Sequence, residues 1–297
     1  MDTDTNNNCA VGLCVYNNER GLPRVLSNIV CMSQSKLFAK ITVVAYYDTS
    51  ADKSYSILES FKNQHSKSGC STLIEMVIIS NNKREIRMSF GNASRVSRTA
   101  RIADARNQIL NYVRLAQNKN KYFIMMDSNE YACVGQINID TLRDALNRSH
   151  EWDSISFDRE AGYYDYWALS FDPHIYSFFH MQNKTEALYQ MITSFSKKLT
   201  ESRESRKLIP VYSAFNGFAI YKTQMFLNCN YTSLIRLHMF PKELLLPCKI
   251  LNHYKNDCEH RQFHLEAIKK NGAKIMVSPL SIFYKLPLPN PSLRGPA

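Results

Sequence analysis

The sequence predicts an α/β fold built on a mostly parallel, twisted central sheet with helices on its faces. Apolar runs and amphipathic segments alternate through the first half of the chain, which is the pattern of a doubly wound sheet. The apolar runs are continuous, as expected for parallel strands that are buried on both faces. Polar residues follow three of these runs, and parallel sheets bind ligands at the carboxyl ends of their strands.

The first half is expected to contain four strands, at 10–16, 40–48, 71–80 and 121–127. Apolar side chains recur at helical spacing in the segments between them, and helices are predicted at 17–32, 54–64 and 98–117.

The second half is less regular. A helix is expected at 137–147, capped near Asn138 or Asp140, and two strands around a glycine turn are expected within 152–171. The charged segment 184–207 is interpreted as a solvated helical insertion or lid. A strand broken at Asn216-Gly217, a helix that stops at a glycine, and a final strand complete this half.

Composition and net charge limit the classes of ligand that the chain is expected to bind. The 297 residues are 44% hydrophobic and 21% charged, as in an ordinary folded protein, and the net charge is +11. Such a charge suits nucleic acid, an anionic surface or a phosphorylated substrate. The basic residues are scattered and no zinc-finger or RNP-type motif is present, so we expect no nucleic-acid partner and favour a phosphate-bearing ligand.

The eight cysteines form no CxxC pair and are interpreted as reduced, buried thiols. The first residues show no signal-peptide pattern, and no apolar run is long enough to span a membrane. We therefore expect a cytoplasmic protein with no transmembrane segment.

Six segments in order resemble the GT-A glycosyltransferases of the family-2 type. They are VGLCVYNNERGLPRVLSNIV, VVAYYDTSADKS, RIADARNQIL, YFIMMDSNE, SAFNGFAIYK and CEHRQFHLEAIKKNGAKIMVSP. DCEHRQFH and YYDYWALSF also resemble a subgroup associated with large DNA viruses, so a viral protein in host cytoplasm is one expectation.

The resemblance implies one GT-A domain at 9–284, with a nucleotide-sugar-binding half at 9–130 and an acceptor and catalytic half at 131–284 that carries a smaller sheet. Residues 285–297 are expected to form a proline-rich, extended tail. The implied function is metal-assisted, inverting transfer of a hexosyl or deoxyhexosyl group from a nucleotide sugar, such as a UDP-sugar, to a hydroxyl of a glycan or glycoprotein. A degenerate domain that binds nucleotide or glycan without catalysis is the alternative, and a basic nucleic-acid-binding protein is a third.

The same resemblance places a Mn²⁺ or Mg²⁺ site at Asp127-Ser128-Asn129-Glu130, with Ser128 at the donor. The family has an acid where Asn129 stands. Either Glu130 substitutes, or the metal binds weakly, or arginine meets the phosphate charge. Alone, this segment also suits an ordinary strand-ending turn. His264 is a further candidate ligand, or a structural histidine.

Donor binding is expected at the strand ends and on the Ala-Arg-Asn helix. Asp48 matches the position that accepts from the base, although a turn-forming Asp is the alternative. The other candidates are Tyr16, Asn17, Glu19, Arg98 and Arg106. Glu19 also suits a first-turn acid, and the arginines suit a solvated face.

An inverting transfer needs a base near the acceptor hydroxyl. Glu259 is the first choice, Asp257 the second, and His260 holds the family's Asp position. Acceptor contacts are expected from Tyr164, Asp165, Trp167, Asn216 and Gly217. The alternative is a tyrosine-rich core strand with a plain bulge.

Overall fold

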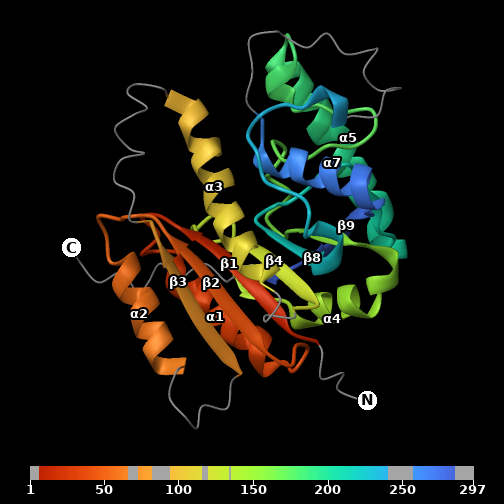
Figure 1. Cartoon of the computed structure of the whole chain (residues 1–297). Coiled ribbons are helices and arrows are strands. Elements are labelled where there is room, and N and C mark those ends of the chain that lie inside the picture. The colour runs from red at the N-terminus through yellow and green to blue at the C-terminus, as the bar shows by residue number, and fades with distance from the viewer. Residues whose placement is uncertain are drawn as a thin grey trace, which may run out of the picture.

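The computed structural model of the chain describes residues 7–65, 73–81, 94–115, 120–133, 135–239 and 257–284. Within them, the larger sheet has eight strands in the order β3-β2-β1-β4-β8-β6-β9-β7, and β10 and β5 form a small second sheet (Figure 1). The strands are β1 (Cys9–Val15), β2 (Ile41–Tyr47), β3 (Ile74–Ser80), β4 (Tyr122–Asp127), β5 (Gln136–Ile137), β6 (Ser154–Asp158), β7 (Ile209–Pro210), β8 (Phe218–Lys222), β9 (Ile275–Ser281) and β10 (Phe283–Tyr284).

The helices surround this sheet. They are α1 (Leu22–Gln34), α2 (Ser54–His65), α3 (Ser94–Arg114), α4 (Ile139–Asn147), α5 (Lys184–Ser205), the short α6 (Thr223–Phe226) and α7 (Glu259–Asn271). Asn138 caps α4 by accepting from the amides of Asp140 and Thr141, as expected, and Gly272 ends α7 with a left-handed φ of 65°.

Strand direction confirms the predicted mostly parallel sheet. β1 pairs in parallel with β2 and β4, β2 with β3, and β6 with β9, whereas β8 runs antiparallel between β4 and β6. The strands of both predicted halves therefore belong to one sheet. Since β1, β2 and β4 are parallel, their carboxyl ends meet at one edge.

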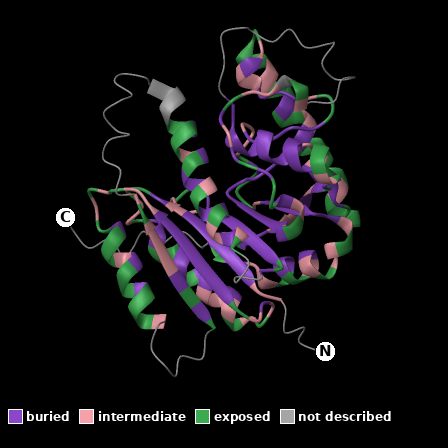
Figure 2. Cartoon of the chain, viewed as in Figure 1, coloured by how far each residue is buried: buried purple, intermediate pink, exposed green. Residues whose placement is uncertain are grey.

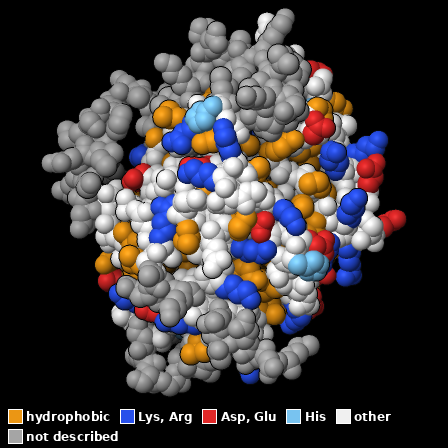
Figure 3. Space-filling view, turned by 45° about the vertical axis from the view of Figure 1, so that its right-hand side comes forward, with side chains coloured by type: hydrophobic (Ala, Val, Ile, Leu, Met, Phe, Trp, Pro, Cys, Tyr) orange, Lys and Arg blue, Asp and Glu red, His pale blue; other side chains and the backbone are white. Residues whose placement is uncertain are grey.

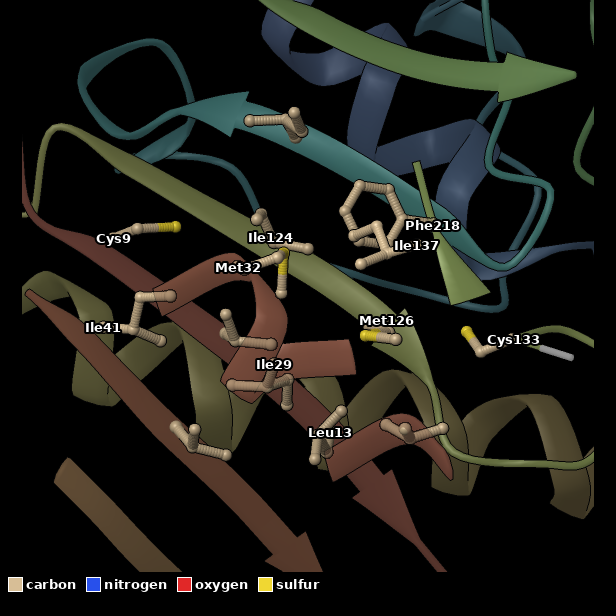
Figure 4. Packing of buried hydrophobic residues seen from close by; sticks show 14 of the residues in the cluster. Cys9, Leu13, Ile29, Met32, Ile41, Ile124, Met126, Cys133, Ile137 and Phe218 are labelled. Carbon is tan, nitrogen blue, oxygen red and sulfur yellow. The ribbon is translucent and has the colours of Figure 1, made fainter. Parts of the chain in front are cut away.

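Side chains that alternate along the strands build a core on each face. Leu13 and Ile124 join the cluster that packs with Ile29 of α1 (Figure 4), whereas Ala10 and Phe123 join the cluster that contains α3 residues. The central strands are buried and the helices expose their outer faces (Figure 2).

Gly12 explains how closely α3 approaches β1. A Cβ at this position would lie 2.6 Å from Cγ2 of Ile109 and 2.8 Å from Sδ of Met125. Only glycine accommodates that approach. Because Ile109 follows Arg106 by less than one turn, the contact also fixes the height of Arg106 above the sheet.

Two expectations for the second half were wrong. The segment 152–171 contains one strand, β6, and residues 163–169 form no strand. Asn216 accepts from the backbone amides of Tyr164 and Asp165, so a side chain takes the place of a strand ladder there. The helix α5 is more than a solvated insertion, because its own residues Met191, Phe195 and Leu199 are buried in the core.

The break in the predicted 209–222 strand is confirmed, with left-handed φ values of 56° at Asn216 and 83° at Gly217. The six cysteines in the described ranges form no disulfide. No helix within those ranges is long and apolar enough to cross a membrane. The predicted tail at 285–297 lies outside them.

Candidate active site

A cavity of about 1020 Å³ opens at the sheet edge where β1, β2 and β4 end. It is bordered by α3 on one side and by the start of α7 on another. Most of the predicted site residues line it: Tyr16, Asp48, Arg98, Arg106, Asp127, Ser128, Asn129, Tyr164, Asp165, Trp167, Glu259 and His260. The structure thus joins predicted donor-side and acceptor-side residues in one space.

Arg106 is the central cation of this cavity. It is only 6% exposed, and its guanidinium donates to Oε1 of Glu259 and, at 3.2 Å, to Oδ1 of Asp127. The guanidinium also lies 4.6 Å from the ring centroid of Phe215. Burial raises the pKa of Asp127, while the neighbouring guanidinium opposes that shift. Arg106 therefore links the end of β4 to the first residue of α7.

His260 is held neutral beside this arginine. Its ring stacks on Phe215 at 3.9 Å, and burial, with Arg106 and His264 nearby, lowers its pKa well below the ordinary value. Arg106 also contacts Nε2 of His260. Since a guanidinium can only donate, Nε2 faces Arg106 as an acceptor. Arg106 engages Oε1 of Glu259 as well, but that carboxylate has a second oxygen, so Glu259 stays the better candidate base.

The donor side is organised by Asn18. Its Oδ1 accepts from the amide of Tyr16 and from the hydroxyl of Ser128, both at 2.8 Å. Oγ of Ser128 also lies 2.5 Å from the carbonyl oxygen of Cys14, so its one proton is shared between the two acceptors. These bonds join the ends of β1 and β4 side by side. Asp48 ends β2 beside them, and its Oδ1 accepts from Asn81 at 3.4 Å.

On the acceptor side, Tyr164, Asp165 and Trp167 form a wall of the cavity, and Asn216 supports the backbone of this wall. Asn216 is buried and accepts from the amides of Tyr164 and Asp165 at 3.1 and 3.3 Å, while its own Nδ2 donates to the carbonyl oxygen of Phe157. The Tyr164 hydroxyl lies 3.5 Å from Oδ2 of Asp127. Burial, reinforced by the charge of Asp127, raises the pKa of Asp165 to about 7. Asn216 itself does not line the cavity; it sets the backbone that does.

Gly217 permits the close packing behind this wall. A Cβ there would lie 2.7 Å from Cβ of Ala132 and 2.8 Å from the Tyr164 hydroxyl. Its carbonyl oxygen accepts from the amide of Asp127 at 2.9 Å. Like Asn216, Gly217 is a supporting residue behind the cavity.

Two predicted donor residues have structural contacts instead. Asn17 accepts from the amide of Ala51, and Glu19 accepts from the amide of Lys53. Both contacts tie the end of β1 to the loop after β2, and neither residue lines the cavity.

The second-choice base is also placed away from the cavity. Asp257 is 1% exposed, and its Oδ2 accepts from Nε of Arg261 at 2.8 Å. Although burial acts to raise its pKa, Arg261 and His180 hold the pKa of this carboxyl below its usual value. Arg261 also donates to the carbonyl oxygens of Trp167, Leu169 and Ile175. Asp257 therefore anchors the segment behind the acceptor wall.

The predicted metal ligands do not assemble. Oδ1 of Asn129 accepts from the amides of Tyr131 and Ala132 at 2.9 and 2.8 Å, in the turn that was the alternative interpretation. Glu130 is exposed and does not line the cavity. His264 is fully buried, and its two ring nitrogens contact Ser213 and Tyr221. Among the described residues, no three His, Cys, Asp or Glu side chains are grouped to hold a metal ion, so Asp127 is the one carboxylate of the predicted set at the cavity.

Sequence reasoning missed several lining residues. Asn18 carried a signal, because it stands beside Asn17 at the end of a predicted strand. Arg159 follows β6, and its guanidinium lies 4.8 Å from the Tyr164 ring. Phe215 carried no signal in the sequence, because its role depends on packing against Arg106 and His260 from other elements.

The surface charge is dispersed on the face that Figure 3 shows. Lys and Arg side chains there are interspersed with acidic, hydrophobic and neutral ones and form no continuous band.

Comparison with known proteins gives a family for most of the chain. Residues 9–265 match the family model described as "Cryptococcal mannosyltransferase 1". No curated protein matches the chain. None of the findings supports the predicted viral subgroup.

Several solved structures are similar to the chain at low identity and with TM-scores below 0.5. Staphylococcus aureus TarS (residues 1–349) is 15% identical with a TM-score of 0.48, over 93% of this chain and 59% of that chain. The mannosyltransferase PcManGT from Pyrobaculum calidifontis, solved with GDP-Man and Mn²⁺, is 11% identical with a TM-score of 0.45, over 91% and 56%. Glucosyl-3-phosphoglycerate synthase from Mycobacterium tuberculosis, solved with Mn²⁺, UDP and phosphoglyceric acid, is 9% identical with a TM-score of 0.44, over 97% and 73%. The chain thus spans less than two thirds of TarS 1–349 and of PcManGT, and these likenesses concern the fold alone.

Proposed function

Because the chain belongs to the family described as "Cryptococcal mannosyltransferase 1", we propose that it transfers a hexosyl group, mannose first among them, from a nucleoside-diphosphate sugar to a hydroxyl of a glycan or glycoprotein. The proposal rests on one observation: the strand ends of β1, β2 and β4 share a cavity with Glu259, Tyr164 and Trp167. A donor and an acceptor therefore have adjoining places.

The donor would lie along the sheet edge. Asp48 offers a carboxylate that can accept from a base N–H, and Ser128, Asn18 and Arg106 line the same cavity. Arg106 and Arg98 supply positive charge for the diphosphate, and guanidinium groups match phosphate oxygens in geometry as well as charge. The sugar then extends toward Tyr164 and Trp167.

Glu259 would act as the base. It is the first residue of α7, where the helix dipole favours a carboxylate, and it pairs with Arg106. The acceptor oxygen bonds to the anomeric carbon as its proton passes to Glu259, and the bond from that carbon to the diphosphate oxygen breaks. The nucleoside diphosphate leaves with the electron pair, so one displacement inverts the anomeric configuration.

The test is transfer from a donor panel. Full-length protein is incubated with GDP-mannose and with UDP-hexoses, each with mannose-containing oligosaccharides, and product is followed by mass spectrometry and nucleotide release. We expect a hexose added from at least one donor, with proton NMR showing the opposite anomer. Retention of configuration would contradict Glu259 as base in a single displacement, and binding of a nucleotide without turnover across the panel would contradict transfer.

One observation favours a second candidate. Oε1 of Glu259 is engaged by Arg106, and the predicted metal ligands do not assemble, as suits a domain that binds nucleotide or glycan without catalysis. The same panel separates the two, because only the enzyme releases free nucleoside diphosphate. The cytoplasmic location stays a prediction to be measured.

A further inference from the structure

The proposed donor is a diphosphate, and its negative charge needs a cation. Of the predicted metal ligands Asp127, Asn129 and Glu130, only Asp127 has a carboxylate at the cavity. The other acidic residues of the lining, Asp48, Asp104, Asp165 and Glu259, are not grouped with it to hold a metal ion among the described residues. The two oxygens of Asp127 already have partners: Oδ1 accepts from Arg106 at 3.2 Å, and Oδ2 lies 3.5 Å from the Tyr164 hydroxyl. A divalent ion would compete with the guanidinium for this one carboxylate.

Resting on the proposed function, we propose that Arg106 is the resident cation for the nucleoside diphosphate, so that donor binding does not require a divalent metal ion. The guanidinium is the cation that lies beside the carboxylate at the end of β4.

Three features suit Arg106 to this role. It is 6% exposed, so its charge acts in a medium of low dielectric constant, where electrostatic interactions are strengthened. Its charge persists, because Glu259 and Asp127 raise its pKa well above the usual value against the opposing effect of burial. Its position is rigid, because the Gly12–Ile109 contact seats α3 on β1 and Phe215 lies against the guanidinium.

Further cations line the cavity beside Arg106. Its neighbour His260 is neutral, and Arg98, Arg101 and Arg159 line the same cavity. Asp127 and Glu259 together balance more than the charge of Arg106, so the other arginines are needed to make the donor side attractive to a diphosphate. In this proposal Arg106 orients the diphosphate, and the outer arginines supply the attraction that the two neighbouring carboxylates offset at Arg106.

The test compares nucleotide binding with and without metal. Full-length protein is freed of metal with EDTA, and GDP and UDP are each titrated calorimetrically in EDTA and in excess Mn²⁺. We expect binding of at least one nucleotide in EDTA, with a Kd that Mn²⁺ changes by less than about tenfold, which corresponds to about 1.4 kcal/mol. Binding that appears only with Mn²⁺, or that Mn²⁺ tightens by tenfold or more, would overturn the inference and leave the proposed function standing. No binding under either condition would overturn both.

Variants then assign the effect to Arg106. We expect Arg106→Gln to weaken metal-free binding by roughly 10- to 100-fold, since it removes charge-assisted hydrogen bonds. Arg143→Gln is the matched control, because Arg143 is an exposed arginine on α4 outside the cavity and its loss changes the net charge equally. A folded Arg106→Gln protein, checked by circular dichroism, that binds as tightly as wild type in EDTA would overturn the role of Arg106.

Loss of folding in that variant would not end the test. The wild-type comparison in EDTA and Mn²⁺ needs no variant. Arg106→Lys keeps the buried charge but loses the planar guanidinium with its paired N–H donors. We therefore expect its nucleotide affinity in EDTA to lie between those of wild type and Arg106→Gln.

Discussion

Arg106 and Glu259 are 153 residues apart in the sequence and form an ion pair inside the cavity, with side chains only 7% and 6% exposed. One partner belongs to α3 and the other begins α7. The position of the candidate base is therefore set by a residue from the donor-binding half. A shift of either helix would move both groups together.

Glu259→Gln is expected to lower kcat by about 100-fold or more, the usual contribution of a general base. Glutamine keeps the size of the side chain and an oxygen that accepts from Arg106, so GDP or UDP affinity should stay within a few fold. Initial rates and calorimetry on the same samples check both statements. Glu266→Gln is the control, because Glu266 lies on the same helix outside the cavity, paired with Lys270. A Glu259→Gln protein with near wild-type kcat would remove Glu259 as the base.

Asp165 is expected to make stability fall as pH rises. Its pKa goes from 3.8 to about 7 in the fold, chiefly through burial, so between these values the native state holds a proton that the unfolded chain has lost. The free energy of unfolding should then decrease with pH, by up to about 1.4 kcal/mol for each pH unit from this group. Asp165→Asn should flatten the slope between about pH 4 and 7 in urea unfolding series. An unchanged slope would mean that Asp165 titrates normally.

The buried Asp257–Arg261 pair should differ sharply from an exposed pair. Arg261→Met leaves the Asp257 carboxylate buried without its cation, so we expect a loss of about 3–5 kcal/mol in the free energy of unfolding. Arg143→Met breaks the exposed pair with Asp140 and should cost less than about 1 kcal/mol. The double variant Asp257→Asn, Arg261→Met should cost less than the sum of the single changes. Additive costs in urea titrations would show that the two side chains are not coupled.

Gly217→Ala should destabilise more than Gly162→Ala. Both glycines have left-handed φ values, 83° and 90°, so each substitution costs about 1–3 kcal/mol of backbone strain. Only at Gly217 would the new Cβ also meet Ala132 and the Tyr164 hydroxyl, whereas nothing lies within 4 Å at Gly162. Thermal unfolding of the two variants isolates the packing cost. Equal losses would mean that the wall at Tyr164 yields to the methyl group.

The strands and the sheet edge were predictable because local hydrophobic pattern determines which segments become buried strands. Asp48, Asp127 and Ser128 end such strands, so their place at the edge could be predicted. The sequence ranked Asp257 below Glu259 but could not exclude it, because its exclusion depends on contacts with Arg261 and His180 in the core. The 163–169 segment was misassigned for a similar reason, since its backbone bonds to Asn216, about fifty residues further along the chain.

The support that Asn216 gives to Tyr164 and Asp165 has a consequence for how such a protein diversifies. The hydrogen bond at position 164 reaches a backbone amide, so it does not depend on the side chain there. At position 165 the side chain matters as well, because the carboxylate of Asp165 accepts from the amides of Asn216 and Ala168. Tyr164 is 42% exposed, and its replacement would leave the bonds at its own amide intact. Related chains that keep this asparagine and the aspartate at 165 can therefore exchange the residue at 164, and acquire new acceptor preferences, while the loop retains its path.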